Sequence, residues 1–180
     1  MSVTTTESTE NKATRRSAKS ISVYMNDALT RETLAIELVE HAIRENTGTR
    51  LGAFLTLLSW ELEEDRESLV RLMGELGVRR KRGRVVLARV AEKLSRVRVG
   101  SPSPLSHLVE LEALHLQTEA KLDMWTALRS RLGPHVRDID VDELIRRTER
   151  QAGELDRRRL AVAATALTSR TQQHAAAAPA

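Results

Sequence analysis

Apolar residues recur three and four positions apart in four segments of the chain, which is the spacing that places them on one face of a helix. The clearest stripe contains Leu51, Leu55, Leu58, Leu62 and Leu69, with charged residues between its members. This pattern predicts amphipathic helices that bury one face in a shared core. Four helices are predicted, over residues 30–46 (or from as early as residue 22), 49–76, 104–132 and 140–168.

Helix start and stop signals fall at the ends of these segments. Ser103 followed by Pro104 is typical of an N-cap with proline at the first helical position. Asp140 with Glu143 resembles a capping box, and Gly77 is placed to end the second helix as a left-handed C-cap. The segment boundaries therefore agree with the apolar pattern.

The connections between the segments differ in length. The first two helices and the last two are joined by short turns, whereas a long connection that contains its own short amphipathic helix, over 85–97, separates the second from the third. Short connections make antiparallel neighbours, and one long crossover between two hairpins is the connection found in ferritin-like folds. The expected fold class is all-α: a ferritin-like antiparallel four-helix bundle with a short helix in the crossover.

One stretch of the second helix adds a resemblance at the level of residues. The segment EEDRESLVRL, from Glu63 to Leu72, is similar to the EE-x-x-E-H-x-x-x-L pattern of rubrerythrin-like and other ferritin-like proteins. In that match Asp65 takes the place of the ligand glutamate and Ser68 the place of the histidine. The resemblance implies a carboxylate di-metal bundle whose site has been altered or lost, often dimeric and often associated with stress.

Metal ligands carried over from that resemblance come from all four helices. Such families use carboxylates and two Glu-x-x-His pairs, but here the residue three positions after Glu149 is Ala152. Iron or manganese would want several carboxylates with imidazole. The candidate ligands are Glu37, Asp65, Glu112, His115 and Glu149.

Asp65 also has an explanation without a metal. It lies close to the apolar stripe of its helix, so its carboxylate needs a partner if it is buried. An arginine from another helix would serve, and Arg159 is a candidate. The neighbouring glutamates of that helix are interpreted as a solvated face with local ion pairs.

Composition limits the number of domains. The chain has 180 residues, 41% hydrophobic and 30% charged, which suits one core of ordinary size. Residues 1–20 are polar and residues 170–180 are rich in alanine, so both ends are predicted as disordered tails flanking a helical domain over 21–169.

The composition and the motifs of the chain also argue against several classes of function. The chain has no cysteine, which excludes disulfides, thiolate catalysis and zinc fingers. It contains no glycine-rich phosphate loop and no grouping of Ser, His and Asp, so the enzyme question stays open and leans towards no. Without a signal peptide or a stretch apolar enough to span a bilayer, the expected location is the cytoplasm.

Two surface features give further hypotheses. Five of the six residues from 79 to 84 are basic, which raises binding to nucleic acid or an anionic surface. No groove-reading motif accompanies them. Leu57, Leu114 and Leu116 flank the main stripes and are expected to be exposed, where they would support a homodimer. The basic residues are Arg79, Arg80, Lys81, Arg82 and Arg84.

The leading interpretation is a non-catalytic helical bundle that acts as an interaction or stress-associated protein. It has no cofactor, and its partner is a second copy or another protein. The alternative is an iron- or manganese-dependent oxidase or metal-binding protein that uses the ligands above, and the third is nucleic-acid or anionic-surface binding.

Overall fold

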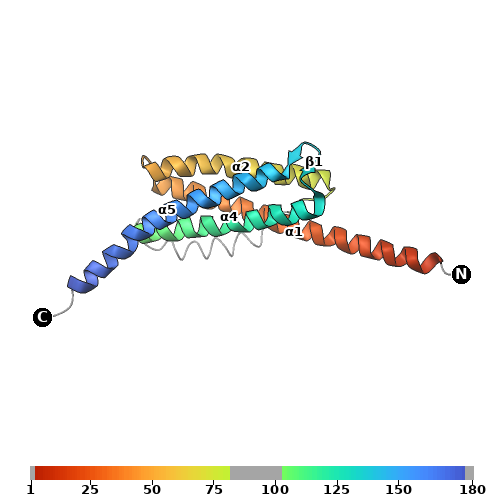
Figure 1. The fold of residues 1–180 in the computed structure, drawn as a ribbon, viewed down its shortest axis with the longest axis horizontal. Helices are drawn as coiled ribbons and strands as arrows, with labels where there is room; N and C mark the ends of the chain where they lie inside the picture. The colour runs from red at the N-terminus through yellow and green to blue at the C-terminus, as the bar shows by residue number, and fades with distance from the viewer. Residues whose placement is uncertain (1–2, 82–102, 177–180) are drawn as a thin grey trace.

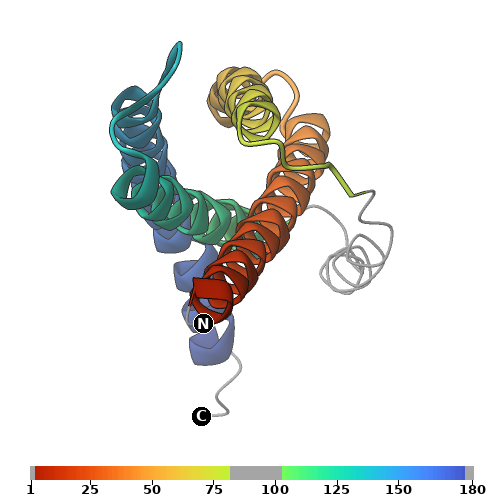
Figure 2. The same ribbon diagram turned by 90° about the vertical axis from the view of Figure 1, so that its right-hand side faces the viewer.

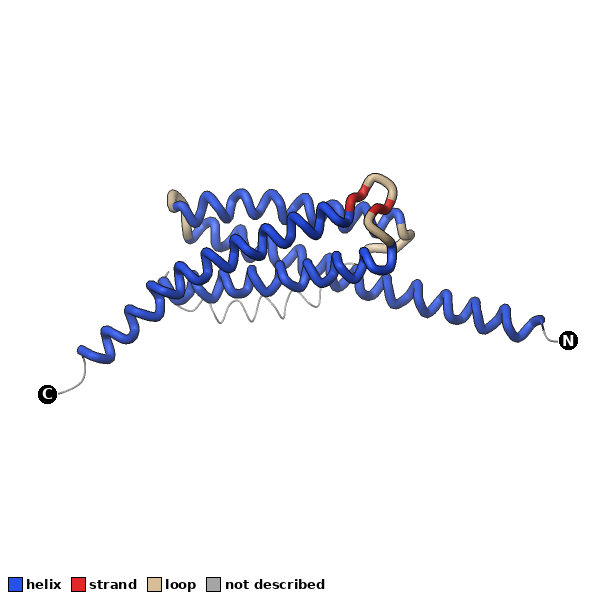
Figure 3. Tube along the Cα trace, viewed as in Figure 1, coloured by secondary structure: helices blue, strands red, loops and turns tan. Residues whose placement is uncertain are grey.

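A computed structural model describes residues 3–81 and 103–176 of the chain, with side-chain surroundings at 16–81 and 103–167. Within these residues it is helical apart from turns and one two-residue hairpin, so the predicted all-α class is confirmed (Figures 1 and 3). The elements are α1 (Val3–Glu45), α2 (Arg50–Glu75), α4 (Pro104–Leu132), β1 (His135–Val136), β2 (Ile139–Asp140) and α5 (Val141–Ala176).

The helix boundaries follow the predicted caps. The Ser103 hydroxyl accepts from the Ser106 amide at 3.2 Å, and the Ser106 hydroxyl accepts in return from the Ser103 amide at 2.9 Å. Asp140 accepts from the Glu143 amide at 2.9 Å and thereby caps α5. Gly77 has a φ of 64°, the left-handed conformation expected where α2 ends.

Two helices are longer than predicted. Helix α1 begins at Val3 rather than at Thr30 or Ser22, and α5 continues to Ala176. The chain contains neither glycine nor proline before Gly48, so nothing in its first residues breaks a helix once α1 has formed. The backbone over most of the predicted N-terminal tail is therefore helical, whereas the division into one domain and two tails stays a prediction.

Two connections complete the comparison with the predicted elements. Between α4 and α5, where a plain loop was expected, the strands pair antiparallel with His135 opposite Asp140 and Val136 opposite Ile139. Arg137 at the tip has a φ of 53°. The predicted crossover helix over 85–97 lies outside the described residues.

The four helices run alongside one another (Figures 1 and 2). Helices α1 and α2 are antiparallel, as are α4 and α5, whereas α4 runs in the same direction as α2. Helix α1 packs against both α2 and α4, and α4 packs against α5. Helices α2 and α5 approach each other much more sparsely. The seam between α2 and α5 is thus the least closely packed of the four.

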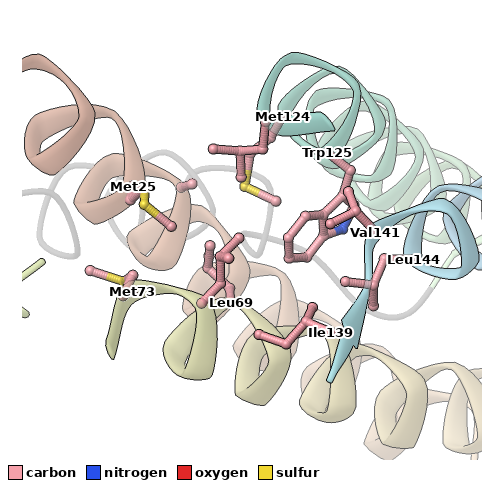
Figure 4. Close-up of a cluster of buried hydrophobic side chains, with 11 residues drawn as sticks. Met25, Leu69, Met73, Met124, Trp125, Ile139, Val141 and Leu144 are labelled. Carbon is pink, nitrogen blue, oxygen red and sulfur yellow. The ribbon is translucent and has the colours of Figure 1, made fainter. Parts of the chain in front are cut away.

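The apolar side chains form two separate clusters along the length of the helices. One cluster, drawn in Figure 4, surrounds Trp125 and includes Met25, Leu69, Met73 and Leu144 together with Ile139 of β2. The other cluster lies towards the turn between α1 and α2. Its buried members are Ala35, Ile36, Leu38, Val39, Ala42, Leu55, Leu58, Leu62, Leu111, Leu114 and Leu155.

The prediction of exposed leucines is correct for Leu57 and Leu116, which are 62% and 68% exposed. It is wrong for Leu114, which is 1% exposed and belongs to the second apolar cluster. Leu114 is three residues after Leu111 on α4, so it faces the core one turn further along the same stripe.

Candidate functional site

A layer of buried polar side chains separates the two apolar clusters, and every helix contributes to it. Glu32 comes from α1, Asp65 from α2, Lys121 from α4 and Gln151 from α5, all buried. On each helix the apolar residues on one side of this position belong to one cluster and those on the other side to the second cluster. We call these four residues, together with Arg147 of α5, the ionic layer.

In each helix the layer residue takes a position that the core repeat would otherwise give to an apolar residue. On α1 the buried positions Ala28, Glu32 and Ala35 follow one another at spacings of four and three. The same repeat runs through the other helices, so the polar residues face inward for the same geometric reason as their apolar neighbours. On α4 this repeat runs through the buried residues Leu111, Leu114, Thr118, Lys121, Trp125 and Leu128.

Lys121 is the centre of the layer. Its ammonium donates to Asp65 Oδ2 at 2.5 Å and to Gln151 Oε1 at 2.8 Å, and lies 3.9 Å from Glu32 Oε2. Lys121 is only 2% exposed. Since an isolated ammonium is very unfavourable away from water, these partners on three other helices are what allow Lys121 to be buried.

Arg147 supplies the second cation of the layer. One guanidinium nitrogen lies 2.5 Å from Asp65 Oδ1, and the other donates to Glu64 Oε2 at 2.7 Å. Gln151 adds two bonds to α2, from Nε2 to Glu61 Oε2 at 2.9 Å and to Asp65 Oδ2 at 3.2 Å. Polar side chains of α5 therefore bridge the sparsely packed seam to α2.

Two surface hollows lie along this seam. One, of about 380 Å³, is lined partly by Ser68 and Arg147. The other, of about 480 Å³, is lined partly by Phe54, Gly153 and Gln151. The ionic layer thus reaches the surface on the α2–α5 side.

Glu32 is the member of the layer with the weakest contacts. Burial raises its pKa to about 7, and the nearby Lys121 ammonium opposes that rise only in part. The Asp65 carboxylate raises the pKa further because two negative charges lie close together. Within the described part of the chain, Glu32 Oε2 accepts no hydrogen bond, so its contact with Lys121 is coulombic.

Other buried hydroxyls near the layer are satisfied by their own helices. Thr118 donates to the Leu114 carbonyl at 3.0 Å, and Thr148 donates to the Leu144 carbonyl at 2.7 Å. Ser68, the residue matched to the family histidine, donates to the Glu64 carbonyl at 2.8 Å. These hydroxyls do not add ligands to the charged centre.

The five predicted metal ligands are not brought together. Asp65 lies in the ionic layer, whereas Glu37 and Glu149 are exposed on α1 and α5. Glu112 lies 3.9 Å from an Arg159 nitrogen, and His115 is close enough to Asp156 to help lower the pKa of that carboxyl, after the larger effect of Arg159. No group of three or more metal-ligating side chains occurs among the residues that the structure describes.

The expectation that Asp65 is buried with a cationic partner is confirmed, but the proposed partner Arg159 is wrong. Arg159 pairs with Asp156 on its own helix at 2.5 Å, because it lies beyond the layer along α5. Arg147 and Lys121 take the role instead. Sequence reasoning missed Glu32, Lys121, Arg147 and Gln151. The interruption of the apolar repeats by polar residues is a signal that could have found Glu32, Lys121 and Gln151.

The basic segment is exposed and held by one side chain. Asn26 of α1 donates to the Arg79 carbonyl at 3.1 Å and accepts from the Lys81 amide at 2.6 Å. Arg79, Arg80 and Lys81 all expose their side chains. Arg82 and Arg84, the rest of the predicted anion-binding run, lie outside the described residues.

Comparisons with protein-family models, with curated proteins and with solved structures found no match for this chain. Among the described helices, none combines the length and apolar character needed to cross a membrane.

Proposed function

We propose that this chain is a non-catalytic helical protein that acts through its surfaces, and that its helices form a ferritin-like antiparallel four-helix bundle. The observation that carries the proposal is the ionic layer, in which Lys121 and Arg147 both pair with the Asp65 carboxylate and Lys121 also lies near Glu32. A stress-associated role is the part of the proposal that rests on the resemblance of the segment from Glu63 to Leu72.

The charges of the layer argue for structure rather than chemistry. In a carboxylate di-metal site the ligands balance the charge of the metal. Here the Lys121 ammonium donates directly to Asp65, so a divalent cation would have to displace a cation that the chain itself holds in place. The layer therefore serves to fix the helices, and partners are met at the surface.

Metal content tests this proposal against the di-iron or di-manganese alternative. Protein purified without chelator or histidine tag, incubated with ferrous iron or with manganese and desalted, should carry well under one metal per chain by elemental analysis. Lys121→Gln, which removes the competing ammonium, provides the comparison. Stoichiometric metal in the wild-type protein would overturn the proposal and move the oxidase alternative to first place.

A second candidate function rests on the exposed basic segment. Asn26 holds the backbone of Arg79 and Lys81 while their side chains face solvent, an arrangement suited to phosphate groups. Binding to duplex DNA should then weaken steeply with salt, and neutralising Arg79, Arg80 and Lys81 together should reduce that salt dependence. A matched control neutralises Arg146, Arg150 and Arg157 of α5, which changes the net charge equally. Equal losses from both sets would argue against a defined site.

A further inference from the structure

Helix α2 carries a second stripe on its exposed side, which borders the seam with α5 at Leu57 and Glu64. Its members repeat at alternating spacings of three and four, the heptad spacing of a helix that packs against another helix. All of them are exposed, although the middle of the stripe is apolar. The outer stripe consists of Arg50, Ala53, Leu57, Trp60, Glu64, Glu67 and Arg71.

The apolar middle is unusual for a solvent-facing surface. Leu57 is 62% exposed and Trp60 is 68% exposed, and they lie three residues apart on the same side of the helix. Tryptophan is the side chain most enriched at the energetic centre of interfaces. A single exposed leucine is common on protein surfaces. An exposed leucine and an exposed tryptophan together, at the centre of a heptad stripe, form an apolar patch that can pack against another helix.

We infer that the outer stripe joins two copies of this chain, with α2 packed antiparallel to α2 of the second copy about a two-fold axis between Leu57 and Trp60. This inference rests on the proposed function, since it names the partner that the surface meets.

The charged residues of the stripe favour a second copy of the same chain as the partner. Arg50 lies seven residues before Leu57, and Glu67 lies seven residues after Trp60. A two-fold axis between Leu57 and Trp60 therefore places Leu57 opposite Trp60 of the second copy, and Arg50 opposite Glu67 of the second copy, at both ends of the contact. An isologous interface needs this kind of self-complementarity.

The parallel arrangement lacks that complementarity. It would put Arg50 beside Arg50 and Glu67 beside Glu67, and like charges at facing positions are unfavourable. The antiparallel register converts the same four charges into two opposite pairs. The charge pattern of the stripe thus favours a second copy as the partner, with the two α2 helices antiparallel.

Sedimentation equilibrium tests the association and its location. The wild-type chain should form a dimer whose association constant falls at least about tenfold in Trp60→Glu, because the central anchor is lost. Leu116→Glu is the matched control, since Leu116 on α4 is equally exposed at 68% and lies outside the stripe. Circular dichroism verifies that both variants remain helical. A monomeric wild-type protein, or equal losses in both variants, would overturn the inference.

Charge exchange tests the direction. Arg50→Glu alone and Glu67→Arg alone should each weaken the dimer, because each puts two like charges opposite one another. The double variant restores opposite charges and should recover the association of the wild type. If the double variant is as weak as the sum of the two single variants, the antiparallel register is wrong.

Cross-linking gives an independent measure of register. The chain has no cysteine, so Ala53→Cys and Glu64→Cys each introduce a single thiol, four residues outside Leu57 and Trp60 respectively. Mixed together, the two variants should form a disulfide-linked heterodimer faster than either alone forms a homodimer, because the antiparallel register sets position 53 opposite position 64. Faster homodimer formation would overturn the register.

The failure of this inference can be told apart from failure of the proposed function. A monomer that carries no metal overturns the dimer and leaves a surface-acting helical protein. A dimer that carries stoichiometric metal supports the interface and overturns the non-metal function.

Discussion

At the scale of single residues, Lys121 holds the centre of the molecule. Its ammonium contacts side chains from the three other helices, with Asp65 at 2.5 Å and Gln151 at 2.8 Å. An ion pair in this setting adds little over a well-packed apolar core, but removing one member leaves a buried charge without compensation. The contribution of Lys121 should therefore be large when it is measured by deletion.

Lys121→Met should destabilise the protein by about 3–5 kcal/mol, because Asp65 and Glu32 lose their shared cation while the side-chain volume is nearly kept. Urea denaturation followed by circular dichroism measures the change. Adding Asp65→Leu to this variant should cost less than the two single losses summed, since the two side chains act as a pair. A loss below about 1 kcal/mol in Lys121→Met would show that the ammonium is not essential to the layer.

Glu32 should make stability depend on pH. Its pKa is about 7 in the folded chain against 4.5 for the free side chain, so the folded state binds the extra proton between these values. Stability from this group is therefore full below the lower pKa and is lost as pH rises through the higher one, a change of roughly 3 kcal/mol.

Glu32→Gln removes that titration and leaves the other groups in place. The stability of the variant relative to the wild type should rise as pH increases from about 5 to about 8, because only the wild type must ionise a buried carboxyl. Urea midpoints measured across that range give the comparison. A constant difference between the two proteins would mean that Glu32 does not titrate in the folded state.

At the level of elements, the turn between α1 and α2 requires a glycine at position 52. Gly52 does not have a positive φ, and glycine is needed there because the backbone of the turn comes very close. A Cβ at Gly52 would lie 2.1 Å from the Asn46 carbonyl oxygen, a backbone atom that also accepts from Thr49. Gly74, on the same helix, has open space around it. The two glycines therefore form a matched pair for substitution.

Gly52→Ala should destabilise the protein by on the order of 2 kcal/mol or more, because the end of α1 must move away from α2. Gly74→Ala should instead stabilise it by about 0.5–1 kcal/mol through helix propensity. Thermal unfolding of the two variants beside the wild type measures both signs. A neutral Gly52→Ala would show that this turn adjusts freely.

At the scale of the whole molecule, the ionic layer gives the four helices one register. One apolar cluster lies on either side of it. An apolar repeat alone permits a helix to slide by one turn, since another apolar side chain replaces the first. With the layer in place, a slide would separate Lys121 from Asp65 and leave both buried without a partner.

Replacing the layer by apolar residues should keep the thermal stability of the protein but remove the preference for a single helix register. A variant with Glu32→Leu, Asp65→Leu, Lys121→Met, Arg147→Met and Gln151→Leu should unfold at the same or a higher temperature, because buried ion pairs are often weaker than apolar packing. Its amide NMR spectrum should show broadened or doubled signals from alternative registers. A single sharp set of signals would show that the layer is not needed for a unique arrangement.

The sequence by itself determined the elements of this protein. Apolar spacing, the caps at Ser103 and Asp140 and the glycine at Gly77 are local signals, and each marks a boundary through contacts within a few residues. The start of α1 was not predicted, because the first residues of the chain have no apolar face. No glycine or proline among them ends the helix, so it extends to Val3. The burial of Asp65 was also predictable, since it shares the stripe of its own helix.

Only the tertiary structure decided which polar side chains meet. Lys121 lies far from Glu32, Asp65 and Gln151 in the sequence, and its contacts depend on how four helices are rotated and shifted against one another. A rotation by one position moves a side chain off the core, which is why Glu37 and Glu149 could be offered as ligands and are found at the surface. Sequence periodicity predicts which face of each helix is buried, whereas the packing of the four helices decides which side chains contact one another across the core.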